Sequence, residues 1–226
     1  MAAKIIAVFN QKGGCGKSMT SMQLGGAFGL RKLRTLVVDM DEQGTSSIWS
    51  AQATEEDPFP ARVVSMAIQQ ESMVGEVKKF INDFDIILID CPPAIKSRIP
   101  WAALNIADFG LIPVTPFMDN IWASKAACDL GLLAQQENPA LELAFLVSMF
   151  RRGRLLDICL DHLKENQRIP ILTSVISLRN AFPESQVYGA SVHALGRKLP
   201  ATLEVEALAD ELLKKLKVSV KGKKHG

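Results

Sequence analysis

The feature that most constrains the fold is a glycine-rich loop at residues 10–18, which reads NQKGGCGKS. It follows an apolar segment at residues 4–9 and leads into a segment with helical spacing at residues 17–32. Glycines let the backbone turn tightly, and the N–H groups of such a loop and of the helix after it point at an anion. The order of strand, loop and helix therefore predicts a phosphate-binding loop, with an incidental glycine-rich turn as the alternative.

The side chains of this loop predict how it binds a nucleoside triphosphate. Lys17 supplies positive charge for the β- and γ-phosphates, Ser18 supplies a hydroxyl for Mg²⁺, and Cys15 fills a position suited to a small residue. The turn is expected from three glycines, Gly13, Gly14 and Gly16. The usual pattern begins with glycine where this chain has Gln11, and it needs only one lysine, whereas Lys12 adds a second. Lys12 is therefore expected to have a role of its own.

Short apolar runs alternate with longer helical segments along the chain. The predicted helices include residues 17–32, 119–136 and 154–166, and the predicted strands are 4–9, 35–40, 84–90, 109–114, 141–149 and 171–177. This alternation is typical of βαβ units, and strands that are apolar at every position are expected to have helices over both faces. The predicted fold class is α/β, a mostly parallel sheet flanked by helices on both faces. The 226 residues suit a single domain, residues 1–226, with a basic flexible tail from about residue 218.

Three aspartates lie where predicted strands end. Asp39 and Asp41 are two residues apart, so both side chains leave the same face of the strand, beside the phosphate loop. Asp90 ends another apolar run, which Pro92 and Pro93 terminate. Carboxylates in this place predict a bound cation, although helix capping or turn formation would explain any one of them alone.

These motifs resemble the deviant Walker ATPases of the ParA and MinD family, whose hallmark is a lysine just before the paired glycines. The resemblance covers nearly the whole chain and implies a P-loop NTPase fold with ATP and Mg²⁺ as ligands. It implies that Lys12 reaches across a nucleotide-sandwich dimer to phosphates held by the other subunit. From the family's DxDxQ motif, it implies that Asp41 positions or activates the attacking water. It also implies that the metal is held, partly through water, by Ser18, Asp39 and Asp90.

Two later segments extend the resemblance to the small plasmid-partition ParA (ParF-like) ATPases. They are IPVTPFMDN at residues 112–120 and SQVYGASV at residues 185–192. In relatives these segments lie near the adenine and the dimer interface. The candidate nucleotide neighbours beyond the loop are therefore Met19, Pro113, Phe117 and Met149, although simple burial in the core would explain these residues equally well.

The C-terminal segment is amphipathic and basic. Leucines recur at helical spacing in residues 201–218, and after Glu211 six lysines follow without another acid. The lysines of this segment have three interpretations: they form an ordinary solvent-exposed helix face, they attract the segment to anionic lipid, or they contact DNA phosphates. Because no bulky apolar stripe follows Val220, we favour sequence-independent DNA binding through Arg179, Arg197, Lys198, Lys214, Lys215 and Lys217.

The expected function is that of a partition ATPase with weak intrinsic activity. On this expectation it forms a homodimer with ATP, binds DNA non-specifically, and is stimulated by a ParB-like centromere-binding or adaptor protein to segregate plasmid or mobile-element DNA. A non-DNA cargo and a MinD-like role at a membrane are the alternatives. No apolar run is long enough to span a membrane, so we expect a cytoplasmic, nucleoid-associated protein. The four cysteines are widely spaced, which argues against an iron–sulfur carrier of the same superfamily.

Overall fold

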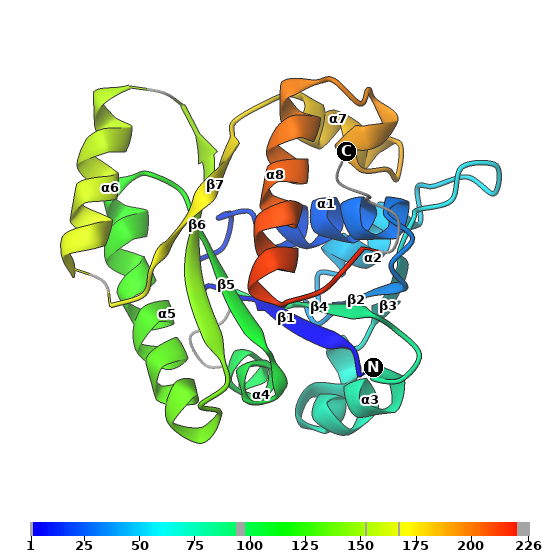
Figure 1. The fold of residues 1–226 in the computed structure, drawn as a ribbon, viewed down its shortest axis with the longest axis horizontal. Helices are drawn as coiled ribbons and strands as arrows, with labels where there is room; N and C mark the ends of the chain where they lie inside the picture. Colours follow the sequence, from blue (N-terminus) through cyan, green and yellow to red (C-terminus); the bar gives the residue numbers. More distant parts are fainter. Residues whose placement is uncertain (1, 94–97, 152, 167, 221–226) are drawn as a thin grey trace.

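The protein is built around one seven-stranded sheet in which all neighbouring strands are parallel (Figure 1). The computed structural model describes residues 2–93, 98–151, 153–166 and 168–220. The strand order is β3-β2-β4-β1-β5-β6-β7. The strands are β1 Lys4–Val8, β2 Thr35–Asp39, β3 Arg62–Ser65, β4 Ile86–Asp90, β5 Phe109–Val114, β6 Glu142–Phe150 and β7 Ile171–Ser177. This sheet confirms the predicted α/β fold class.

Helices cover both faces of the sheet (Figure 1). They are α1 Lys17–Leu30, α2 Thr45–Ser50, α3 Met73–Phe80, α4 Ile99–Ile106, α5 Met118–Glu137, α6 Arg154–Asn166, α7 Ala181–Val187 and α8 Pro200–Lys215. Residues of α3, α4, α5 and α6 pack into a hydrophobic cluster on one face. Residues of α1, α2, α7 and α8 pack into a second cluster on the other face. The sheet is therefore the middle of three layers.

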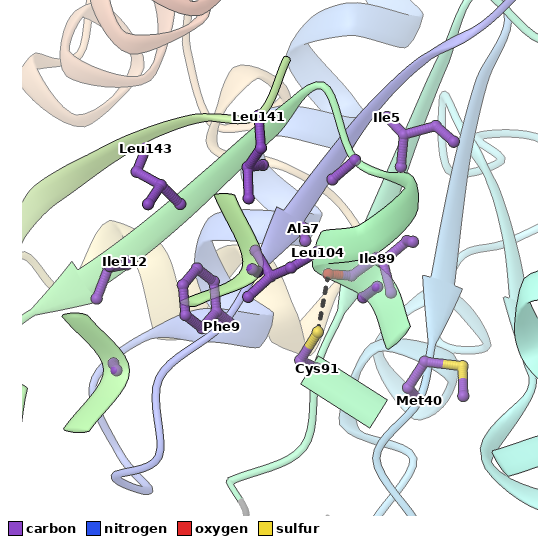
Figure 2. Packing of buried hydrophobic residues seen from close by; sticks show 14 of the residues in the cluster. Ile5, Ala7, Phe9, Met40, Ile89, Cys91, Leu104, Ile112, Leu141 and Leu143 are labelled. Atoms are coloured by element: carbon purple, nitrogen blue, oxygen red, sulfur yellow. Dashed lines mark hydrogen bonds between the residues drawn. The ribbon is translucent and has the colours of Figure 1, made fainter. Parts of the chain in front are cut away.

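The central strand β1 shows why its sequence is apolar at nearly every position. Side chains alternate between the two faces of a strand. Ile5 and Ala7 join the cluster on the side of α4, where Figure 2 shows them with Leu104, and Ile6 and Val8 join the cluster on the side of α1. All four β1 side chains are buried. A strand covered on both faces has no position for a polar side chain, as expected for a parallel sheet.

The strand order changes its direction of winding at β1. From β1 the chain turns to β2 and β3 on one side of the sheet, and from β4 it crosses to β5, β6 and β7 on the other. In open α/β sheets, ligands bind outside the carboxyl ends of the strands, where the direction of winding changes. The loops after β1, β2 and β4 meet at this edge, and they carry the motifs identified in the sequence.

One element differs from the expectations. The apolar pattern predicts no strand at residues 62–65, yet β3 pairs there with β2 as an edge strand, and its residues are only partly buried, which removes the apolar signal. Val218 and Val220 pack against the cluster on the α1 face, and the flexible tail expected from about residue 218 stays a prediction. The rest of that expected tail, residues 221–226, lies outside the described residues. Among the described helices, none is both long and apolar enough to cross a membrane.

Candidate functional site

The glycine-rich loop joins β1 to α1 in the conformation that a phosphate-binding loop requires. Gly14 and Gly16 have φ angles of 73° and 91°, in the left-handed region that favours glycine. Gly16 is the residue before α1, and a Cβ atom there would lie 2.9 Å from the hydroxyl of Ser148 on β6. Position 16 therefore requires glycine for two reasons: its backbone is left-handed, and a side chain there would collide with Ser148.

Lys17 is folded into the loop that precedes it. Its side chain is buried, and its ammonium group donates a hydrogen bond to the carbonyl oxygen of Lys12 at 3.0 Å. The thiol of Cys15 donates to the same carbonyl at 3.3 Å, and burial raises the pKa of this thiol. The ammonium of Lys17 therefore lies within the glycine-rich loop, against its backbone.

Lys12 has the opposite orientation. Its ammonium group lies outside the loop, 2.5 Å from the carboxylate of Asp119 in the first turn of α5. The hydrogen bond from Lys12 lowers the pKa of Asp119, whose side chain remains largely exposed. The backbone N–H of Lys12 donates to the side-chain oxygen of Asn10 at 3.2 Å. The two lysines of the loop therefore occupy different environments, one inward and one outward.

Strand register brings the predicted acids together. Asp39 at the end of β2 and Asp90 at the end of β4 are direct partners across the sheet, and Val8 of β1 is the partner of Asp90 on its other side. Asp39 accepts hydrogen bonds from the N–H and the hydroxyl of Ser47, both at 2.8 Å, and from the N–H of Asp41 at 3.2 Å. The carboxylate of Asp41 accepts the N–H of Gln43 at 3.0 Å. Asp41 lies two residues beyond Asp39, in the loop after β2.

Asp90 is fully buried and holds an unsatisfied oxygen. Burial raises its pKa to about 7, and the hydroxyl of Ser46, followed by that of the nearby Ser18, offsets part of this rise. The Ser46 hydroxyl donates to Oδ2 at 2.7 Å, whereas Oδ1 has no hydrogen-bond partner among the described residues. An orphaned carboxylate oxygen beside Lys17 and Ser18 fits the water shell of a Mg²⁺ ion.

The donor set fits Mg²⁺ better than a metal enclosed by protein ligands. Within the described residues, no group of three or more His, Cys, Asp or Glu side chains could hold a metal ion. Mg²⁺ is usually bound through one or two carboxylates, waters and substrate phosphates. The residues present therefore fit this ion together with a nucleotide.

The candidate neighbours of the base lie on two sides of the loop. A Cβ atom at Gly16 would meet the terminal methyl groups of Met19 and Met149 at 3.4 and 3.5 Å, so these two side chains lie together at the loop. Met149 has a φ of 53°, uncommon for a residue other than glycine, where the pairing of β6 with β7 is irregular. Pro113 is buried in β5, and Phe117 is exposed just before α5. Their contact with adenine stays a prediction.

The basic residues predicted to bind DNA do not form one patch. Arg197 and Lys198 precede α8, whereas Lys214, Lys215 and Lys217 lie at its other end. A helix of this length separates the two groups by about 24 Å. Arg179 forms an ion pair with Glu204 of α8 at 2.7 Å, so its guanidinium is already engaged. DNA binding by these residues stays a prediction.

Comparison with known proteins identifies the family. The family described as the CobQ/CobB/MinD/ParA nucleotide binding domain matches residues 6–192, which is most of the chain. The chain belongs to this family. This match confirms the resemblance to ParA and MinD proteins that was based on the glycine-rich loop and its two lysines.

Individual relatives of the ParA/MinD family match over nearly the whole length. The "Maintenance of carboxysome distribution protein A" of Halothiobacillus neapolitanus is 28% identical over 209 residues, 92% of this chain and 95% of that protein. "Protein ParA" of Rhizobium radiobacter is 27% identical over 223 residues, 94% of this chain and 97% of that protein. The septum site-determining protein MinD of Pyrococcus horikoshii, solved with Mg-ADP, has a TM-score of 0.75 at 18% identity, covering 97% of this chain and 99% of that chain. Its fold is the same.

Several polar residues of the site carry no clear signal in the sequence. The motif predicts the acids, but not that Ser46 and Ser47 of α2 hydrogen-bond to them. The run of hydroxyl residues that follows Gly44, residues 45–47, is the available sign, although serine is common in turns. Asn10 anchors the loop by donating to the carbonyl of Pro113 at 2.8 Å, and its partner lies 103 residues away in the chain.

Proposed function

We propose that the protein is a ParA-type positioning ATPase that binds ATP and Mg²⁺ and works as a nucleotide-sandwich dimer. The observation that carries this proposal is the opposite placement of the two loop lysines. Lys17 is buried within its own loop, where it can neutralise phosphates in the same subunit. Lys12 faces outward and is held by the carboxylate of Asp119, which is largely exposed, so its ammonium is free to reach a second subunit once that contact opens.

Each group of site residues has its own proposed role in ATP hydrolysis. Lys17 and the glycine loop would hold the phosphates, Ser18, Asp39 and Asp90 would hold the metal, partly through water, and Asp41 would orient the attacking water. Mg²⁺, when bound, neutralises charge on the phosphate oxygens. Charge at the transferring phosphoryl group becomes fully compensated only when Lys12 of the partner arrives, which makes hydrolysis depend on dimerisation.

The dimer is proposed to bind DNA without sequence preference. The lysines at the end of α8 support this proposal, because Lys214, Lys215 and Lys217 follow Glu211 without another acid. Glu211 itself is held at β7, where its carboxylate accepts two backbone N–H groups. The end of α8 is therefore positively charged and suited to phosphate contacts. A partner protein that stimulates hydrolysis would then release the dimer from DNA.

Two classes of cargo are proposed for this ATPase. A large protein assembly is supported by the near full-length relative named for carboxysome distribution. A plasmid or mobile element is supported by the resemblance of residues 112–120 and 185–192 to plasmid-partition ATPases. Deleting the gene in its host separates them, because loss of a replicon indicates DNA cargo, whereas an assembly that clusters while every replicon is retained indicates a protein cargo.

Light scattering with a non-hydrolysable ATP analogue and Mg²⁺ tests the core of the proposal. The expected result is a monomer that becomes a dimer with the analogue but not with ADP. A chain that binds the analogue and stays monomeric contradicts the sandwich. DNA mobility-shift and liposome sedimentation assays on the dimer complete the test, and binding to liposomes but not to DNA would favour a role at the membrane instead.

A further inference from the structure

The first turn of α2 makes direct contact with both buried carboxylates of the site. Ser46 donates to Asp90, and Ser47 donates twice to Asp39. These contacts join residues that are far apart in sequence, since Ser46 and Asp90 are separated by 44 positions. The first turn of α2 therefore lies beside the candidate metal site, although none of its residues belongs to the phosphate loop.

The two carboxylates are held in different ways. Both oxygens of Asp39 are occupied, Oδ2 by Ser47 and Oδ1 by the N–H of Asp41. Asp90 has one oxygen occupied by Ser46 and the other without a partner among the described residues. A buried polar atom without a partner is unfavourable, so Oδ1 of Asp90 is the oxygen that a ligand would satisfy.

α2 is fixed firmly enough to orient these groups. Trp49 is buried in the cluster on the α1 face, and its indole N–H donates to the carbonyl of Ala190 at 2.9 Å. Gly189, beside Ala190, lies so close to residues 52 and 53 that a Cβ atom would come within 2.0 Å of the Ala53 nitrogen. The end of α2 is thereby packed against the turn at residues 188–190. A helix held at its far end positions the hydroxyls of its first turn.

We propose that Ser46 is a positioning residue for the metal: by binding Oδ2 of Asp90, it sets the carboxylate so that Oδ1 faces the water shell of Mg²⁺. The inference rests on the proposed nucleotide function and extends it to a residue outside the known motifs. Partners that orient a metal-binding carboxylate typically change metal affinity by about 10- to 100-fold when removed. Ser46 thus acts through Asp90 and does not itself contact the metal.

The test compares Mn²⁺ affinity, measured by electron paramagnetic resonance in the presence of ADP, for variants of the whole chain. Ser46→Ala and Ser46→Cys are expected to weaken Mn²⁺ binding by about tenfold. The thiol nearly preserves side-chain volume, so a loss in Ser46→Cys does not come from a cavity. Ser50→Ala is the matched control, because the Ser50 hydroxyl donates only to the carbonyl of Ser47 within α2.

A second measurement separates positioning from folding. ADP affinity in EDTA and the melting temperature of the metal-free protein are expected to stay near the wild-type values in the Ser46 variants. Wild-type Mn²⁺ affinity in Ser46→Cys overturns the inference, as does an equal loss of Mn²⁺ affinity in Ser50→Ala or an equal loss of ADP affinity in EDTA. A wild-type chain that binds no Mn²⁺ with ADP overturns the proposed function as well, so the two failures are distinct.

Discussion

The ammonium of Lys12 lies 2.5 Å from the carboxylate of Asp119, 107 residues further along the chain. This contact joins the phosphate loop to the first turn of α5 within one subunit. If Lys12 acts on the nucleotide of a partner, it must leave Asp119 first. The ion pair therefore competes with dimerisation.

Asp119→Asn is expected to lower the ATP concentration at which half of the protein is dimeric, because Lys12 no longer leaves a charged partner. The pair is exposed, and exposed pairs contribute little, so the expected shift is about two- to fivefold. Light scattering across an ATP titration measures it. Asp129→Asn, which removes the same charge from an exposed position of α5, is the control. An unchanged or higher midpoint in Asp119→Asn would show that the contact does not restrain Lys12.

Lys17→Ala is expected to weaken nucleotide binding strongly. Lys17 is the buried charge of the loop, and hydrogen bonds to charged groups contribute about 1.5–3 kcal/mol, which corresponds to about 10- to 150-fold in affinity. Isothermal titration with ATP measures the loss. Lys125→Ala, at an exposed position of α5, should bind as the wild type does. Unchanged ATP affinity in Lys17→Ala would refute the phosphate-loop assignment.

Asp41→Ala is expected to bind ATP and dimerise but to hydrolyse slowly. A positioned base or water-orienting group contributes about 10²- to 10⁴-fold to the rate. Phosphate release from the preformed dimer measures this step separately from binding. Glu42→Ala, at the exposed neighbouring position, tests whether any change in this loop has the same effect. Normal turnover in Asp41→Ala would exclude a catalytic role for Asp41.

The metal-free protein is expected to lose stability as pH rises, and Asp90 is the cause. Its pKa is about 7 in the folded protein against 3.8 for an ordinary aspartate, so the folded chain binds the extra proton between these values. The free energy of unfolding therefore falls as pH rises from about 4 to about 7 and stays low above it. Asp90→Asn should melt higher than the wild type at pH 8 and near it at pH 4. If the melting temperatures of the wild type and Asp90→Asn differed by the same amount at every pH in this range, Asp90 would not be the cause of the pH dependence.

Replacing Lys214, Lys215 and Lys217 together with Ala is expected to weaken DNA binding by the dimer uniformly across sequences. Each phosphate contact contributes about one unit to the slope of log affinity against log salt, so the slope should fall by about three. Fluorescence anisotropy with random-sequence duplexes measures it. Lys125→Ala, which removes a charge from an exposed position of α5 outside the predicted DNA-binding set, is the control. A salt slope equal to that of the wild type would place the DNA surface elsewhere.

The loop and the buried strands could be predicted because each depends on local chemistry. Gly14 and Gly16 have the left-handed backbone that a tight anion-binding turn demands, and β1 is apolar because helices cover both of its faces. β3 could not be predicted in this way, because it lacks burial on both faces. It lies at the edge of the sheet with partly exposed residues, so burial imposes no apolar pattern on it.

The glycine-rich loop, its second lysine, the acids at the strand ends and the alternating α/β architecture can be predicted from the amino-acid sequence. Each of these is encoded within a few consecutive residues, through backbone freedom, charge and hydrophobic period. Three relationships appear only in the folded chain: Asp39 and Asp90 are neighbours, Ser47 donates to Asp39 and Ser46 to Asp90, and Lys12 contacts Asp119. Such pairs depend on strand order and helix packing, which bring distant segments together and leave no mark at either position alone.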